Sequence, residues 1–165
     1  MLLVVSPIYL GDTTSQFHAF VERLHFCTLS YDDYSSYFTG GLNMGVIFTM
    51  NVPQAYCRLQ YKRKLSAQAE AFRSLGGKVQ TLCRFDTLRV RDYSWFSMVG
   101  FDAEHKHAYH EKQFPLDPEK ARQMGKGLVR LANGKIKRGS PGRANMRRAG
   151  GSFASYDIYA MERPS

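Results

Sequence analysis

Met44-Gly45-Val46-Ile47-Phe48-Thr49-Met50 is a short, continuous apolar run, and Pro53 marks its end. A run of this kind is typical of a strand that is buried on both faces, as in a parallel sheet. The run Leu2–Val5, which stops at Ser6-Pro7, has the same character. The two runs therefore predict two buried strands of a parallel sheet.

A helical pattern follows each of these runs. After a loop from Ser6 to Asp12, a first helix has an apolar stripe and three candidate capping residues, Thr13, Thr14 and Ser15; the stripe consists of Phe17, Phe20, Val21 and Leu24. A longer helix is expected from Gln54 to Leu75, and Gly76-Gly77 would end it in a left-handed cap. Its imperfect apolar face consists of Leu59, Leu65, Ala69, Phe72 and Leu75.

The second half of the chain adds one strand and one helix to this pattern. Side chains alternate between polar and apolar over Lys78–Phe85, which predicts a third strand nearer a sheet edge. Asp117-Pro118-Glu119 begins a last helix, expected to run to about Ala132 and to end at Asn133-Gly134. Residues 28–43 read as a long loop rich in tyrosine, and residues 86–116 as an irregular stretch.

Alternation of strands and helices predicts an α/β fold with a parallel sheet. In such sheets, ligands bind beyond the carboxyl ends of the strands. Here those ends correspond to three loops, Ser6–Thr13, Thr49–Gln54 and Asp86–Tyr93. The expected topology therefore places a binding site at these loops.

The positive charge is concentrated near the end of the sequence. Lys and Arg outnumber Asp and Glu by 23 to 14, a formal charge of +9. Residues 134–165 contain seven of the basic residues and two of the acidic ones, and we expect them to form a basic, disordered tail after a domain at 1–133. Because the excess charge lies partly in this tail and no nucleic-acid-recognition motif accompanies it, nucleic-acid binding is not favoured.

Several other classes of protein are disfavoured. The cysteines Cys27, Cys57 and Cys83 form no CxxC pair, so reduced, unreactive thiols are expected. No apolar run approaches the length of about 20 residues that a membrane-spanning helix needs, and we expect a cytoplasmic protein. Ser6 lacks the Gly-x-Ser-x-Gly elbow of a hydrolase nucleophile. The spacing of His105, His107 and His110 places them on no single helical face, so no metal site is expected.

Four motifs together resemble the NAD(P)H-dependent FMN reductases, a family of flavodoxin-fold flavoproteins. The first is Ser6-Pro7-Ile8-Tyr9-Leu10-Gly11, followed by the helical run Gln16–Arg23; the others are Thr49–Pro53, Arg84–Thr87 with Asp92-Tyr93, and Phe114–Asp117. The tyrosine-rich segment Tyr31–Phe38 also resembles an insertion found in one branch of this family. The likeness covers about residues 2–132.

The resemblance implies a flavodoxin-like, three-layer fold with helices on both faces of a parallel sheet. It further implies that FMN is the cofactor, that electrons pass from NAD(P)H to an acceptor, and that the protein is a homodimer with the flavin near the subunit interface. The residues expected to hold the flavin ring are Ser6, Pro7, Ile8, Tyr9, Leu10, Gly11, Thr49, Met50 and Asn51. Because the flavin carries out the redox chemistry, no side chain is assigned as a catalytic acid, base or nucleophile.

The sequence departs from the family at its beginning. The family starts with a strand and a Ser/Gly/Asn-rich loop, whose N–H groups hold the FMN phosphate at a helix N-terminus. That pattern does not precede Leu2 in the sequence, so we expect a fold truncated at its N-terminus, with about three strands. The alternative function is therefore an inactive or partner-dependent fragment of such a flavoprotein.

Overall fold

Three parallel strands form the centre of the fold. In the computed structural model, which describes residues 1–95 and 102–136, the strands have the order β2-β1-β3-β4. Their bounds are Leu2–Tyr9 for β1, Asp12–Thr13 for β2, Leu42–Thr49 for β3 and Gly76–Arg84 for β4. Strands β1, β3 and β4 are parallel, whereas the short β2 pairs antiparallel with the end of β1. The predicted α/β class with a mostly parallel sheet is confirmed.

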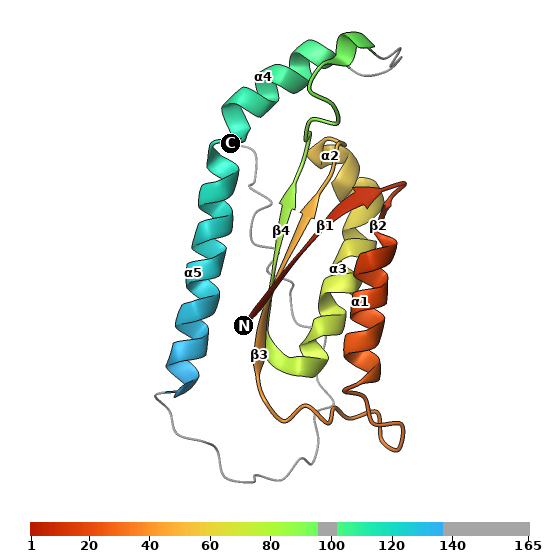
Figure 1. Cartoon of the computed structure of the whole chain (residues 1–165), viewed down its shortest axis with the longest axis vertical. Coiled ribbons are helices and arrows are strands. Elements are labelled where there is room, and N and C mark those ends of the chain that lie inside the picture. Colours follow the sequence, from red (N-terminus) through yellow and green to blue (C-terminus); the bar gives the residue numbers. More distant parts are fainter. Residues whose placement is uncertain (96–101, 137–165) are drawn as a thin grey trace.

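Helices lie on both faces of the sheet (Figure 1). One face carries α1 and α3, and the other carries α5, while α4 lies beyond the upper end of the strands. The helical segments are α1 Ser15–Phe26, α2 Gln54–Tyr56, the π-helix η1 Cys57–Tyr61, α3 Lys62–Ala71, the 3-10 helix η2 Phe72–Leu75, the 3-10 helix η3 Tyr93–Trp95, α4 Ala103–Gln113 and α5 Leu116–Ile136. This three-layer arrangement is consistent with a flavodoxin-like fold.

The core lies between the sheet and the face formed by α1 and α3. Strand β3 is buried along almost its whole length, as its apolar run predicted. Phe17 of α1 meets Phe48 of β3 and Phe72 edge-on, with ring centroids 6.1 and 6.2 Å apart. On the opposite face, Gly45 makes room for side chains from both sides: a Cβ there would lie 2.6 Å from Leu3 Cδ1 and 2.9 Å from Leu128 Cδ1.

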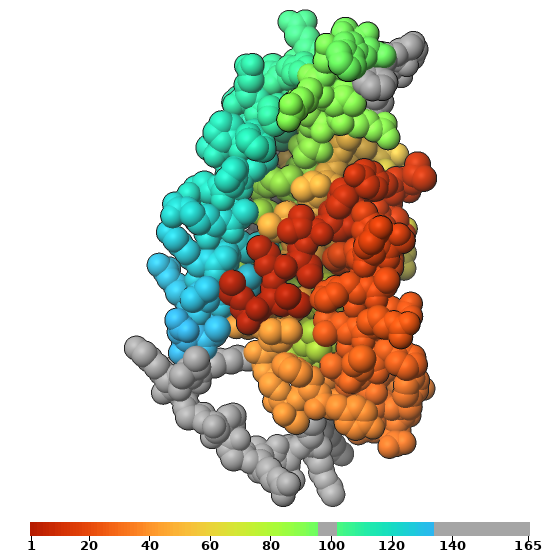
Figure 2. All heavy atoms as spheres, viewed as in Figure 1, coloured from red at the N-terminus to blue at the C-terminus, as the bar shows by residue number. Residues whose placement is uncertain are grey.

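Strand β1 differs from the prediction in two ways. It was expected to be buried on both faces, but Leu3 is 41% and Val5 58% exposed, because α5 packs against β3 and β4. Figure 2 shows the red amino-terminal part of the chain uncovered on the viewed face, between α5 and α1. The predicted loop from Ser6 is also wrong, because Ser6–Tyr9 continues the strand and Pro7 pairs in register with Thr49 of β3.

The long predicted helix is present over its expected range, from Gln54 to Leu75, but it contains a π-helical turn. Gly76 ends it with a φ of 71°, in the left-handed region that the Gly76-Gly77 pair predicted. Leu59 was expected on the apolar face and is instead exposed. The wider π turn at Cys57–Tyr61 explains this difference, since it shifts the phase of the residues within it relative to an ideal helix.

The stretch between β4 and α5 was expected to be irregular and contains α4. Asp102 caps this helix by accepting a hydrogen bond from the backbone N–H of His105. Helix α5 begins at Leu116 rather than at an Asp117 cap and continues through Asn133-Gly134 to Ile136. The first residues of the predicted tail are therefore helical, and the rest of it, 137–165, lies outside the described residues.

Candidate functional site

The candidate site is the edge of the sheet where β1, β3 and β4 end. Because Pro7 of β1 pairs with Thr49 of β3, the turns that follow the two strands begin side by side. Residues directly opposite each other in a ladder point to the same face, so Pro7 and Thr49 share one face, and Tyr9, two residues further along β1, shares it with them. The sheet therefore brings Tyr9 and Thr49 to one edge and one face.

The nine predicted site residues divide according to the alternation of the strands. Ser6, Ile8 and Met50 are buried on the core side, where their side chains cannot reach a ligand at the edge. The Ser6 hydroxyl instead accepts a hydrogen bond from the backbone N–H of Thr14 (3.2 Å), the residue that caps α1. The residues with accessible surface at this edge are Pro7, Tyr9, Leu10, Gly11, Thr49 and Asn51.

A two-residue turn joins β1 to β2. Leu10 has φ 50° and Gly11 has φ 79°, which is the conformation of a type I′ turn between paired strands. Gly11 packs closely, since a Cβ there would lie 3.1 Å from Cε1 of Tyr61. Leu10 is fully exposed, so a left-handed conformation is imposed on an apolar side chain that has no packing to stabilise it.

Replacing Leu10 with asparagine is expected to raise the free energy of unfolding by about 1 kcal/mol, because asparagine tolerates the left-handed region that costs leucine. Urea denaturation followed by circular dichroism measures the change. Leu59→Asn is the matched control, since Leu59 is also exposed but lies in a helical segment. A Leu10→Asn variant no more stable than wild type would contradict the assigned turn.

Asp12 fixes the tip of this hairpin to the helices behind it. Its carboxylate contacts Lys64 Nζ (2.5 Å), Gln68 Nε2 (2.8 Å) and His18 Nε2 (3.2 Å). Desolvation raises the pKa of this carboxyl group, but the hydrogen bonds from Lys64, Gln68, His18 and the Thr13 backbone outweigh it and lower the pKa well below its usual range. The hairpin is therefore held to α1 and α3 by an ionised group.

The turns after β3 and β4 are bound to each other through their backbones. Met50 N–H donates to the carbonyl of Arg84 (2.9 Å), and Thr87 N–H donates to the carbonyl of Met50 (3.1 Å). Asp86 N–H donates to the carbonyl of Val52 (3.1 Å). These bonds make the second and third predicted loops one unit rather than two independent loops.

A buried ion pair attaches α4 to this unit. Lys106 Nζ lies 2.7 Å from Asp86 Oδ1 and also donates to the backbone carbonyl of Asn51. Lys106 is 6% and Asp86 5% exposed. Sequence reasoning missed Lys106 because it missed α4; the signal that could have found the helix is Asp102, a capping residue followed by an acid at Glu104.

Arg84 and Asp117 form a second pair at the same edge. Arg84 Nη1 lies 2.7 Å from Asp117 Oδ1, and Gln113 Nε2 donates to the same oxygen (3.1 Å). Arg84 is the last residue of β4 and Asp117 lies in the first turn of α5. The start of α5 is therefore fixed to the end of the sheet.

Asn51 is the one predicted site residue with an unmatched polar atom. Its side-chain oxygen Oδ1 is buried and has no hydrogen-bond partner among the residues that the structure describes. A buried acceptor without a partner costs about 1–3 kcal/mol, so such an atom is a candidate for contact with a ligand donor. It lies in the turn after β3, where the topology predicted a binding site.

Two cavities lie beside this edge rather than at it. One of about 190 Å³ lies between the turn after β4 and the α4–α5 junction, and is lined by residues that include Asp86, Tyr109 and His110. Another of about 330 Å³ lies between β4 and α5, with Gln80, Lys120 and Met124 among its lining residues. Neither of these two cavities is lined by any of the nine predicted site residues.

The cysteines and histidines that the sequence offered as candidates lie in ordinary packing environments. Burial raises the pKa of Cys57, and burial together with the neighbouring Cys57 raises the pKa of Cys83 to about 12, which keeps both thiols protonated near neutral pH. His105, His107 and His110 each lie beside a different aromatic ring, those of Tyr109, Tyr93 and Phe114. Within residues 1–95 and 102–136, no group of three or more His, Cys, Asp or Glu residues is placed to hold a metal ion.

The helices in the described part of the chain include none with the length and apolar character needed to cross a membrane. Comparison of the chain with protein-family models, with curated proteins and with solved structures finds no match.

Proposed function

We propose that the chain is an FMN-dependent NAD(P)H oxidoreductase that holds the flavin ring at the carboxyl edge of β1 and β3. Two independent lines support this. The motifs Ser6–Gly11 and Thr49–Pro53 resemble the flavin loops of the FMN reductases. The register of Pro7 with Thr49 then brings the ends of these two motifs to one edge of the sheet, where α/β proteins bind ligands.

The observation that carries the proposal is the unpartnered oxygen of Asn51. The polar edge of an isoalloxazine carries one N–H donor, and Asn51 Oδ1 is an acceptor without a partner among the described residues. Tyr9 is exposed at the same edge and offers a flat aromatic surface, to which a ring system can stack. An amide acceptor and an exposed aromatic ring at one edge therefore support the placement of the FMN ring there.

In this proposal the chain binds and orients, and FMN when bound supplies hydride and electron transfer. Asn51 would turn its side-chain amide out of the turn to meet the polar edge of the ring, and Tyr9 would cover one of its faces. The backbone of Thr49–Asn51 holds its position because the turn after β3 is bound to the turn after β4 and, through Lys106, to α4. A preorganised turn lowers the cost of binding, since little ordering remains to be done.

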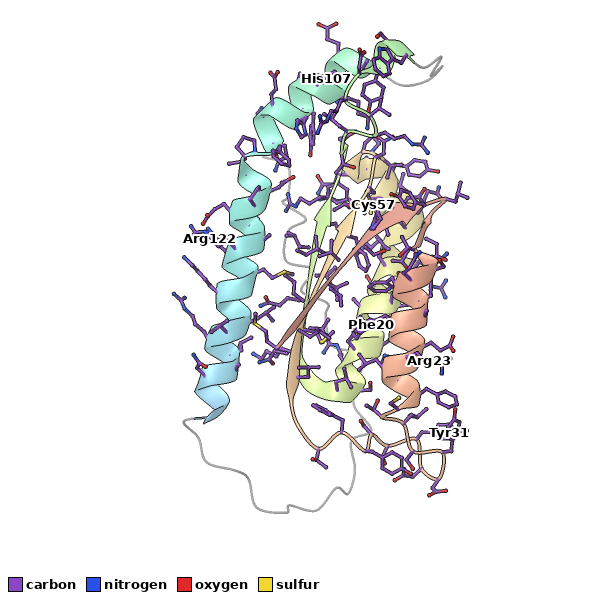
Figure 3. The ribbon with its side chains drawn as sticks, in the orientation of Figure 1. Phe20, Arg23, Tyr31, Cys57, His107 and Arg122 are labelled. Carbon is purple, nitrogen blue, oxygen red and sulfur yellow. The ribbon has the colours of Figure 1, made fainter. Side chains whose placement is uncertain are left out.

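Titration with FMN, read by quenching of flavin fluorescence, tests this proposal. Wild type is expected to saturate, and Asn51→Ala and Tyr9→Ala are each expected to raise Kd about tenfold, which is about 1.4 kcal/mol. Tyr31→Ala is the matched control, because Tyr31 is 63% exposed and Tyr9 62%, and because Tyr31 lies at the opposite end of the molecule from α4 and His107 (Figure 3). Absence of saturable binding, or equal effects of all three substitutions, would contradict the proposal.

A second candidate is that the same edge belongs to an inactive or partner-dependent form of such a flavoprotein. The observation that favours it is the exposure of Leu3 and Val5 on β1, next to the proposed ring site. In α/β proteins both faces of the parallel sheet are normally covered, so a form of the protein with this face covered would be the one that binds FMN. This candidate predicts that FMN binding appears only at protein concentrations at which the chain associates, whereas the first predicts binding at all concentrations.

A further inference from the structure

The cavity of about 190 Å³ between the turn after β4 and the α4–α5 junction has no role in the function proposed above. It lies close to the carboxyl edge of the sheet, where α/β proteins bind ligands, and α4 and α5 meet near the upper ends of the strands (Figure 1). Drug-sized ligands occupy cavities of roughly 300–1,000 Å³, so this cavity suits a smaller molecule. The side chains that line it indicate the chemistry of that molecule.

Two carboxylates line the cavity, but the cations that pair with them do not. Asp86 and Asp117 are among the lining residues, whereas Lys106 and Arg84 are not. Asp86 pairs with Lys106 and Asp117 with Arg84, each through its Oδ1 atom at 2.7 Å. In the second pair the carboxylate is the more accessible partner, since the side chain of Asp117 is 18% exposed and that of Arg84 is 10% exposed. The two ion pairs therefore turn their negative ends toward the cavity.

Aromatic rings form another part of the wall. The rings of His110 and Phe114 stack with their centroids 4.6 Å apart, and both residues line the cavity together with Tyr109. Phe114 is 55% exposed, so part of its ring surface is open to a ligand. The faces of phenylalanine and tyrosine rings carry the negative end of the ring quadrupole and attract cations. The rings of Phe114 and Tyr109 therefore favour the same ligand charge as the two carboxylates.

The helix ends at the cavity agree with this preference. Gln113, the last residue of α4, lines the cavity, and the C-terminal end of a helix carries the negative end of the helix dipole. The positive end of α5 lies at the same junction, but the carboxylate of Asp117 in its first turn offsets that charge. The local field at the cavity therefore favours a ligand with a positive charge.

We propose that this cavity binds a small organic ammonium ion. Its charged group lies at the carboxylates of Asp86 and Asp117, where N–H donors form charge-assisted hydrogen bonds. Its apolar part lies against the rings of Phe114 and Tyr109. This proposal does not depend on FMN, because the residues that line the cavity include none of the nine assigned to the flavin ring.

The ligand is organic rather than a bare metal ion. Within residues 1–95 and 102–136, no three ligating side chains of His, Cys, Asp or Glu are placed to hold a metal ion, and His110 stacks on Phe114 instead of joining the carboxylates. A metal ion would also leave the aromatic part of the wall unused. An ammonium ion with an apolar body uses both the carboxylates and the rings.

Benzylammonium is the probe, because it joins an ammonium group to an aromatic ring, and benzyl alcohol and benzoate are its neutral and anionic counterparts. In a heteronuclear NMR titration without FMN, benzylammonium is expected to shift the amide signals of Thr87, His110 and Phe114 until they saturate. Its Kd should be at least about tenfold lower than that of benzyl alcohol, since charge-assisted hydrogen bonds are the stronger ones. The chain has a formal charge of +9, so general attraction would favour benzoate instead.

Phe114→Ala is expected to raise the Kd for benzylammonium about fivefold, because it removes an attraction between the cation and the ring. Phe26→Ala is the matched control and should leave the Kd unchanged. Each of the two is an exposed phenylalanine at the C-terminal end of a helix, and Phe26 lies edge-on to Tyr31, at the other end of the molecule from α4 (Figure 3).

Asp117→Asn keeps the shape of the side chain, removes its charge, and is expected to raise the Kd at least about tenfold. Circular dichroism establishes whether this variant folds; if it does not, the three probes on wild type and the Phe114→Ala variant decide. Three results would overturn the proposal: no saturable binding of benzylammonium, equal affinity for benzylammonium and benzyl alcohol, or equal effects of Phe114→Ala and Phe26→Ala. None of these results bears on FMN binding, which the fluorescence titration tests separately.

Discussion

Lys106→Met is expected to lower the free energy of unfolding by about 3–5 kcal/mol, the largest effect of any single side chain at the carboxyl edge. The substitution leaves Asp86 as a buried charge without its partner, and Asp86 is 5% exposed. It also removes the hydrogen bond from Lys106 Nζ to the carbonyl of Asn51. Urea denaturation followed by circular dichroism measures the loss.

The matched control is Arg122→Met. Arg122 forms an ion pair with Glu119 at 2.6 Å, but both side chains are exposed, so the expected loss is below about 1 kcal/mol. In the double variant Lys106→Met/Asp86→Asn no buried carboxylate remains, and stability should recover part of the loss. If Lys106→Met costs no more than Arg122→Met, the buried pair does not hold α4 to the sheet.

Gly77→Ala is expected to cost about 3 kcal/mol or more, because the new Cβ would overlap the backbone where β4 begins beside β3. This Cβ would collide with the carbonyl of Leu42 and lie 2.6 Å from the backbone nitrogen of Asn43. The atoms in the way are backbone, so relief requires the two strands to separate locally. Thermal unfolding and urea denaturation measure the cost.

Gly125→Ala is the same substitution at a position where it is expected to stabilise the protein. Gly125 lies inside α5, and a Cβ there meets no atom within 4 Å. Alanine is favoured over glycine in a helix interior by about 1 kcal/mol, so this variant should be more stable than wild type. Equal effects of Gly77→Ala and Gly125→Ala would contradict the close contact between β3 and β4.

The elements with strong local signals were predictable from the sequence. The apolar run at Met44–Met50 predicted a strand buried on both faces, and β3 is such a strand. Thr14 was one of three candidate caps, and it accepts a hydrogen bond from the N–H of Phe17 at the start of α1. Gly76 was predicted to end the long helix, and the helix does end there, with Gly76 in the left-handed conformation at a φ of 71°. In each case the local sequence preference and the tertiary packing favour the same structure.

The features that were missed depend on contacts distant in sequence. Ser6–Tyr9 was predicted to be a loop because Pro7 interrupts the apolar run, yet pairing with β3 keeps it in the sheet. Helix α4 has little apolar periodicity, and the residue that attaches it is the charged Lys106. The predicted site residues show the same limit: the sequence predicted two loops, but the alternation of β1 decides that Tyr9 is accessible and Ser6 is buried.

A heteronuclear NMR titration of the isotopically labelled protein with FMN tests the central claim most directly, since it reports which backbone amides sense the ring. The account predicts that the amide signals of Tyr9, Leu10, Thr49 and Asn51 shift together and that the shifts saturate, while the signals of the tyrosine-rich loop around Tyr31 stay unchanged. Shifts confined to the cavity between β4 and α5, or to the aromatic loop, would contradict it.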